Sequence, residues 1–282
     1  MNTLRKRKRN ISRDEIDYRR FIEDNFEITN KEGKTVPFRL NSIQLQYLEY
    51  DCTWKDIILK FRKPGFSSLI NAIFTADFIL KENSKSLLIC DLDENAEEML
   101  FRVKDFIKSY EVKNKIRVPL KYDAVNMLYN PFMKSRFSIA TAKNADVGRS
   151  RDITNLHCSE VAFYPNIKRI LAGAGQAMVS GAKRIFETTA NGFNEFRKFY
   201  QEAKEGQNGY KPIFYGVGDF YSKAFLEEKK RELKELALQE YPNNETESFL
   251  ASGECYFDKK TLSEVYLFQK DKYPIEKGLI YV

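Results

Sequence analysis

The chain has 282 residues, which is enough to bury one substantial core, so one large domain with short appendages is expected. It contains no run of about 18 apolar residues, so no membrane-spanning helix is expected. The four cysteines are scattered and His157 is the only histidine, which argues against a zinc site or a disulfide framework. Any metal would therefore be a hard ion such as Mg²⁺, held by oxygen ligands.

Positive charge is concentrated at the start of the chain. The formal net charge is +7, and five of the first ten residues are Lys or Arg. A basic arm attracts polyanions, chiefly nucleic acid, although a solvated tail is an equal alternative. We expect residues 1–36 to form this arm, loosely helical over 1–30. The first residues lack the apolar stretch of a secretion signal, so a cytoplasmic location is expected.

From residue 37 onward, short apolar segments alternate with amphipathic ones. This alternation is typical of an α/β fold with a mostly parallel central sheet flanked by helices, because strands covered on both faces are apolar throughout. The expected strands are 56–59, 86–90, 137–141, 154–158, 184–187 and 213–217. The expected helices are 67–80, 93–110 and 223–239. The sequence thus predicts a domain over 37–257, followed by a linker over 258–282.

The first motif is a basic loop between the first strand and its helix. Backbone N–H groups of such a loop, and the N-terminus of the helix, can face a phosphate. Compared with the usual G-x-x-x-x-G-K-[ST] pattern, Lys60 replaces the first glycine and Phe66 the lysine, whereas Gly65 and Ser67 are retained. An ordinary basic loop is the alternative. The predicted phosphate contacts are Lys60, Arg62, Lys63, Pro64, Gly65, Phe66, Ser67 and Ser68, with Ser67 also a candidate Mg²⁺ ligand and Lys60, Arg62 or Lys63 as the main cation.

The second motif is the strand over 154–158, which is followed by Ser159 and Glu160. Parallel strands place their carboxyl ends beside the phosphate loop, so Glu160 is the candidate that orients the attacking water. Ser159 stands where an aspartate is common, and its hydroxyl could hold Mg²⁺ directly or through water. The alternative is that any strand may end in a glutamate.

Two further loops carry candidate residues. The strand over 184–187 runs into a small polar loop that could sense the γ-phosphate, although Asn-Gly is also an ordinary turn dipeptide. Arg149 and Arg151 precede the strand over 154–158 and could stabilise charge on a phosphate across a subunit boundary, or contact DNA, or be solvated. The loop residues are Thr188, Thr189, Ala190, Asn191 and Gly192.

Taken together, the motifs over 36–257 resemble those of the large terminases of tailed phages. The segment 38–44 resembles the adenine-recognising Q-type motif of that family, which makes Gln44 the candidate base reader. The loop from Lys60 resembles a Walker A variant with its lysine at the front, so the resemblance assigns phosphate binding to Lys60 with Arg62 in support. The segment 159–165 resembles the Walker B element, 188–192 the coupling motif, and 247–257 the end of the ATPase domain.

Arg149 lies eleven residues before Glu160, where some terminases carry a trans-acting arginine finger, and Arg151 is the reserve candidate. The resemblance implies a P-loop NTPase fold of the RecA/ASCE type with a small lid subdomain at about 215–250. It further implies an ATPase motor that uses ATP and Mg²⁺ to move double-stranded DNA into a procapsid.

The implied partners are the portal protein, the small terminase subunit and further copies of this chain in a ring, with an isolated domain expected to be monomeric. The implied location is the host cytoplasm, with transient docking on the procapsid. No nuclease activity is expected, because the acidic cluster of the terminase nuclease is missing. Two alternatives remain: a helicase-like DNA translocase, disfavoured by the lack of a DExH box and of a second RecA-like domain, and a DNA- or partner-binding module that does not hydrolyse ATP.

Overall fold

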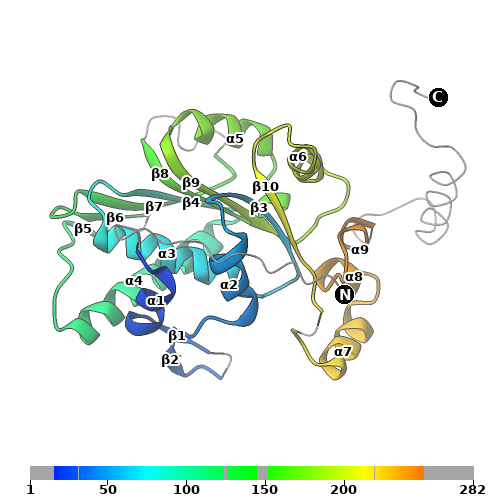
Figure 1. The fold of residues 1–282 in the computed structure, drawn as a ribbon, viewed down its shortest axis with the longest axis horizontal. Helices are drawn as coiled ribbons and strands as arrows, with labels where there is room; N and C mark the ends of the chain where they lie inside the picture. The colour runs from blue at the N-terminus through cyan, green and yellow to red at the C-terminus, as the bar shows by residue number, and fades with distance from the viewer. Residues whose placement is uncertain (1–15, 31, 124–125, 145–151, 219, 251–282) are drawn as a thin grey trace, which may run out of the picture.

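The protein is described by a computed structural model that covers residues 16–30, 32–123, 126–144, 152–218 and 220–250. Within these ranges, a central sheet has the strand order β10-β3-β9-β8-β4-β7-β6-β5 (Figure 1). The first six of these strands run parallel, and β6 and β5 complete one edge in antiparallel pairing. In the sheet order, the strands are Lys211–Tyr215, Lys55–Lys60, Met178–Thr188, Ile153–Ser159, Lys85–Cys90, Ser135–Thr141, Met127–Asn130 and Tyr122–Asp123.

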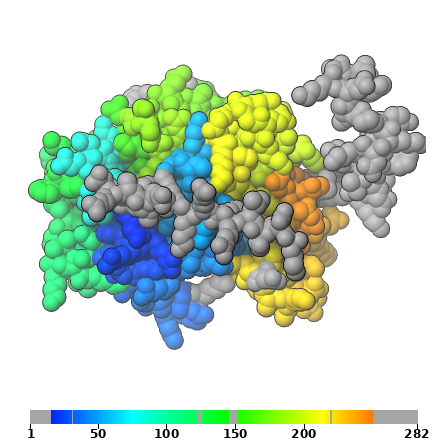
Figure 2. Space-filling view, in the orientation of Figure 1, coloured from blue at the N-terminus to red at the C-terminus, as the bar shows by residue number. Residues whose placement is uncertain are grey.

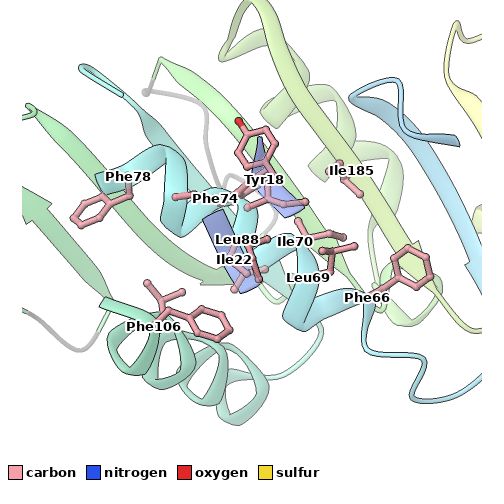
Figure 3. Close-up of a cluster of buried hydrophobic side chains, with 14 of the residues drawn as sticks. Tyr18, Ile22, Phe66, Leu69, Ile70, Phe74, Phe78, Leu88, Phe106 and Ile185 are labelled. Atoms are coloured by element: carbon pink, nitrogen blue, oxygen red, sulfur yellow. The ribbon is translucent and has the colours of Figure 1, made fainter. Parts of the chain in front are cut away.

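The central strands are largely apolar, and their successive side chains point to opposite faces of the sheet. Both faces are therefore buried. In β3, Ile58 belongs to the core on one face, whereas Ile57 and Leu59 belong to the core on the other. Helices α1 (Tyr18–Asn25), α3 (Phe66–Leu80) and α4 (Asp93–Asn114) cover the first face, which Figure 3 shows in part. Helices α5 (Ile167–Gln176) and α6 (Glu195–Lys204) cover the second. The layers confirm the predicted α/β class, and each predicted strand overlaps an observed one.

The N-terminal segment is more closely packed than the sequence suggests. Helix α1 is followed by the hairpin of β1 (Glu27–Thr29) and β2 (Thr35–Pro37), and then by α2 (Ser42–Gln46) and the π-helical turn η1 (Tyr47–Asp51). Ile22 and Phe26 are fully buried in the core, where α1 packs against α3 and α4. The packed residues therefore begin earlier than the boundary drawn at residue 37, and residues 1–15 and 31 of the predicted basic arm lie outside the described residues.

The C-terminal helices gather at one end of the molecule, beyond β10 (Figure 1), where they form the orange surface and the yellow surface below it (Figure 2). They are α7 (Lys223–Leu233), α8 (Leu236–Glu240) and α9 (Glu245–Leu250), in the region predicted to form a lid. The single helix predicted over 223–239 is interrupted at Lys234, whose φ of 52° is left-handed. The predicted linker over 258–282 lies outside the described residues. Across the described ranges, no helix has both the length and the apolar composition needed to cross a bilayer.

A buried polar cluster joins three elements at the amino ends of the central strands. The ammonium of Lys183 in β9 donates to the carboxylate of Asp77 in α3 and to the hydroxyl of Tyr18 in α1. It also lies 4.6 Å from the ring centroid of Trp54. Burial lowers the pKa of Lys183 to about 8, because desolvation outweighs its pairing with Asp77.

Candidate functional site

The basic loop between β3 and α3 has the backbone of an anion site. Lys60 ends β3, and Phe66 begins α3 after a turn in which Lys63 and Gly65 have positive φ values of 59° and 84°. Gly65 is the N-cap of α3 and provides no side chain to cap it. The first N–H groups of α3 therefore receive no hydrogen bond from a capping side chain at Gly65. They face the loop, which is the arrangement that favours an anion at a helix N-terminus.

Two side chains of the preceding segment hold this loop in place. Gln44 donates from Nε2 to the carbonyl of Gly65 at 2.7 Å, and Asn41 donates from Nδ2 to the carbonyl of Pro64 at 2.9 Å. Asn41 and Gln44 also cap α2 reciprocally, a capping box visible in the sequence as N-x-x-Q. A Cβ on Gly65 would lie 2.7 Å from the Gln44 amide nitrogen, so this position requires glycine. Gln44 is 2% exposed, and the role shown by these contacts is to brace the loop. Its reading of adenine stays a prediction.

Phe66, at the position where a lysine is usual, packs into the core instead. Its ring is fully buried, stacks on Tyr215 with centroids 5.1 Å apart, and meets the edge of Tyr47 at 5.4 Å. Phe66 therefore offers no cation to the loop. Lys60 occupies the last residue of β3, at the front of the same loop.

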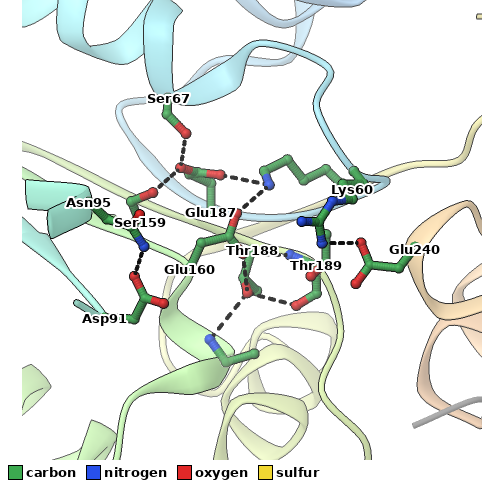
Figure 4. Close-up of polar contacts among 12 residues, drawn as sticks. Lys60, Ser67, Asp91, Asn95, Ser159, Glu160, Glu187, Thr188, Thr189 and Glu240 are labelled. Atoms are coloured by element: carbon green, nitrogen blue, oxygen red, sulfur yellow. Dashed lines mark hydrogen bonds and ion pairs between the residues drawn. The ribbon is translucent and has the colours of Figure 1, made fainter. Parts of the chain in front are cut away.

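The ammonium of Lys60 lies between two carboxylates. Its Nζ is 3.0 Å from Oε1 of Glu160 and 3.1 Å from Oε2 of Glu187 (Figure 4). Burial opposes the charge on Lys60, but Glu160 and Glu187 outweigh it and raise its pKa above the usual value. The residue is thus a fixed cation at the carboxyl edge of the sheet.

Glu160 follows β8 and turns the chain into the short helix η2 (Val161–Phe163) with a left-handed φ of 55°. Its side chain is 30% exposed, whereas that of Glu187 is fully buried. The second oxygen of Glu160 is 3.3 Å from the backbone nitrogen of Thr189, which donates to it. Burial raises the pKa of Glu160 against the attraction of Lys60, and Glu187 adds to the rise. A carboxylate of raised basicity beside open space suits the orientation of a water molecule.

Glu187 is a site residue to which the sequence analysis gave no role. It reaches the site because β9 lies between β3 and β8, with Glu187 in register with Ser159 of β8. Ser67 and Ser159 each donate to its Oε1 at 2.7 Å, and Nε2 of His157 lies 3.3 Å away. Burial disfavours its charge, but Lys60 and His157 outweigh burial and lower the pKa of Glu187 below the usual value.

Lys60, Ser67, Ser159 and Glu160 line a cavity of about 570 Å³ at the carboxyl edge of the sheet. That volume lies within the range of small-molecule sites. The predicted residues along its wall are Lys60, Arg62, Lys63, Pro64, Gly65, Phe66, Ser67, Ser68, Ser159, Glu160 and Thr189. Gln44, Thr188, Ala190, Asn191 and Gly192 are not among the lining residues. Arg149 and Arg151 lie outside the described residues.

Helix α4 adds a cation that the sequence analysis missed. Arg102 lines the cavity and donates from Nη1 to Oγ of Ser68 at 3.0 Å, while Nη2 pairs with Glu98 at 3.1 Å. In the sequence, Arg102 is one charged residue among many on a helix, and only the packing of α4 against α3 places it here.

The predicted coupling loop and the phosphate loop both contact helix α8. Gln239 donates from Nε2 to the carbonyl of Ala190 at 2.6 Å. The next residue, Glu240, accepts from the backbone nitrogen of Arg62 at 2.7 Å and pairs with its guanidinium at 2.8 Å. Asn191 donates to the carbonyl of Ala162 at 3.3 Å, which ties the coupling loop to η2.

The donor groups at the site fit a Mg²⁺ ion that is held largely by phosphates. Ser67 and Ser159 offer hydroxyl oxygens, which are hard ligands. In the part of the chain that the structure describes, no group of three or more His, Cys, Asp or Glu residues is arranged to hold a metal. Mg²⁺ commonly binds through few protein ligands together with substrate phosphates, so this sparse set is compatible with it.

No protein-family model matches the chain, and no curated protein matches it. Solved structures do match the fold. The ATPase domain of the large terminase from Thermus phage P74-26 aligns with a TM-score of 0.57 and 16% identity, over 73% of this chain and 94% of that one. The large terminase of bacteriophage HK97 aligns with a TM-score of 0.57 and 14% identity, over 90% of this chain and 52% of that one.

A large terminase from a thermophilic bacteriophage, solved in complex with ATP-gamma-S, aligns with a TM-score of 0.56 and 15% identity. The match covers 73% of this chain and 52% of that one. The chain thus spans about half the length of this protein and of the HK97 terminase. Its fold is the P-loop ATPase fold found in the ATPase domains of large terminases.

Proposed function

We propose that this chain is the ATPase motor domain of a phage large terminase, which hydrolyses ATP to translocate double-stranded DNA into a procapsid. The observation that carries the proposal is the contact of Lys60 with Glu160. These side chains come from positions 100 residues apart and meet at 3.0 Å beside the uncapped end of α3. A cation suited to bind phosphate and a carboxylate suited to orient water therefore lie in one cavity, which supports the proposal.

Phosphate binding is assigned to the loop N–H groups, to Lys60 and to the start of α3. Phosphate oxygens beside Lys60 would compete with Glu160 for its ammonium, which would free the Glu160 carboxylate to orient water. Mg²⁺, bound with the nucleotide, would neutralise charge that develops on the phosphates, with Ser67 as the protein ligand and Ser159 in support. Catalysis of this kind consists of positioning and electrostatic stabilisation.

Coupling of hydrolysis to movement is assigned to the loop over 188–192 and to the C-terminal helices. The bond from Gln239 to Ala190 and the pairing of Arg62 with Glu240 support this assignment, because α8 contacts both loops. The net charge of +7 supports contact with DNA phosphates. Assembly into a ring on the portal protein, with the small terminase subunit and with Arg149 or Arg151 reaching a neighbouring site, belongs to the proposal, as does action in the host cytoplasm.

The proposal is tested by DNA-stimulated ATP hydrolysis and by ATP binding. Glu160→Gln keeps the size of the side chain, so we expect ATP binding to persist while turnover falls at least about tenfold, as when a group that stabilises the transition state is removed. Lys60→Ala should lower both binding and turnover. The matched controls are Glu195→Gln and Lys85→Ala, whose side chains are ion-paired outside the cavity.

Two results would redirect the proposal. A wild-type protein that binds DNA but shows no turnover at any protein concentration would favour the binding module. Strand separation coupled to hydrolysis would favour the helicase-like translocase. Turnover that is unchanged in Glu160→Gln would remove the basis of the proposed site.

A further inference from the structure

Glu187 holds two hydroxyl groups of the site in one orientation. Ser67 of α3 and Ser159 of β8 both donate to the same oxygen, Oε1 of Glu187, at 2.7 Å (Figure 4). A hydroxyl has one proton and two lone pairs. Because both protons are directed at Glu187, the lone pairs of both oxygens are available on the side of the cavity, which both serines line.

The carboxylate acts from behind the cavity wall. Glu187 is fully buried and is not among the lining residues, whereas Lys60, Ser67 and Ser159 all are. Glu187 can therefore act on a ligand through its contacts with these three residues and, at longer range, through its charge. A carboxylate that accepts from a metal-ligating group fixes the orientation of that group and raises its basicity.

The carboxylate of Glu187 can be compared with an aspartate of P-loop ATPases. That aspartate ends the Walker B strand and helps to hold Mg²⁺. Here that position is Ser159, which carries no charge. Glu187 is its register partner on the neighbouring strand β9. Glu187 thus provides a negative charge level with Ser159, but on the neighbouring strand β9 instead of on β8.

We propose that Glu187 organises the Mg²⁺ site of this chain as a positioning residue, orienting the hydroxyls of Ser67 and Ser159 and supplying the negative charge that Ser159 lacks. This inference rests on the proposed ATPase function. Lys60 balances the charge of Glu187 at 3.1 Å, and His157 supports it at 3.3 Å from the side of β8. The residue is assigned no contact with the nucleotide.

The test measures the affinity for ATP-gamma-S by calorimetry, with Mg²⁺ and with EDTA, and takes the ratio of the two affinities as the Mg²⁺ gain. In Glu187→Gln, we expect this gain to fall about 10- to 100-fold, the loss typical when a partner of a metal ligand is removed. The affinity in EDTA should stay equal or rise. In Glu187→Gln/Ser159→Asp, the carboxylate moves to β8, and the Mg²⁺ gain should recover. Glu195→Gln is the control carboxylate, and thermal unfolding verifies that each variant is folded.

Failure of this inference and failure of the proposed function are separable. If wild type fails to bind ATP-gamma-S under either condition, both are overturned. If wild type shows a Mg²⁺ gain that Glu187→Gln retains, or that the double variant does not restore, only the role of Glu187 is overturned. Should Glu187→Gln fail to fold, the double variant decides alone, since it keeps the net charge: a gain like that of wild type supports the inference, and its loss refutes it.

Discussion

Replacement of Gly65 by alanine should damage the phosphate loop in two separable ways. The left-handed backbone at Gly65 costs an L-residue about 1–2 kcal/mol. The new Cβ would also lie 2.7 Å from the amide nitrogen of Gln44, which must then leave the carbonyl of Gly65. Leaving that buried pair unsatisfied costs about 1–3 kcal/mol. The free energy of unfolding should therefore fall by about 2–5 kcal/mol in Gly65→Ala, the sum of these two effects.

Gly206 provides the matched control, because it has a similar φ of 73° but a Cβ added there would meet no atom within 4 Å. Gly206→Ala should show the backbone cost alone. For a domain of this size, 1 kcal/mol corresponds to roughly 2–4 °C in Tm, so Gly65→Ala should melt about 2–12 °C below Gly206→Ala. Thermal unfolding followed by circular dichroism measures the difference.

A double-mutant cycle with Gln44→Ala isolates the contact itself. In that background the amide is already gone, so Gly65→Ala should cost only about 1–2 kcal/mol, the backbone cost. If the two substitutions were instead additive, or if Gly65→Ala and Gly206→Ala melted together, the account of Gln44 as the brace of the loop would be refuted.

Two other expectations concern pH and salt. The unfolded chain holds the proton of Lys183 up to about pH 10.4, whereas the folded chain releases it near pH 8, so the unfolded state binds more protons between these values and stability rises with pH. Denaturant titrations from pH 8 to 9.5 should show that the free energy of unfolding of wild type rises by up to about 2 kcal/mol relative to that of Lys183→Met. If the free energies of the two proteins changed in parallel with pH, the lowered pKa of Lys183 would be contradicted. Binding of double-stranded DNA should weaken at least about tenfold between about 50 and 200 mM salt, the loss expected for two phosphate contacts, and a flat profile in filter binding would argue against phosphate recognition.

The strands of the sheet could be predicted because burial on both faces makes them apolar throughout. Strand β9 was predicted over 184–187 but begins at Met178. Its first part was missed because residues 179–181 are exposed and Ser180 and Gly181 interrupt the apolar run. The break between α7 and α8 was missed because Lys234 adopts a positive φ without a glycine or proline to mark it. Local composition therefore predicts buried strands well, but it does not predict a turn at a residue other than glycine or proline.

The site was predictable only in part, for a different reason. Lys60, Ser67 and Glu160 follow a motif order that is legible along the chain. Glu187 becomes a site residue only through the strand order, which inserts β9 between β3, which ends at Lys60, and β8, which Glu160 follows. No local pattern around Glu187 distinguishes it from any glutamate at the end of a strand. Arg102 was hidden similarly, because only helix packing brings it to the cavity.

Helix α8 contacts two loops that are distant from one another in the sequence. Its consecutive residues Gln239 and Glu240 contact Ala190 and Arg62, which belong to the predicted coupling loop and the predicted phosphate loop respectively. Helix α8 also packs against α7 and α9. A shift of either loop would therefore act on the same short helix, and through it on all three C-terminal helices.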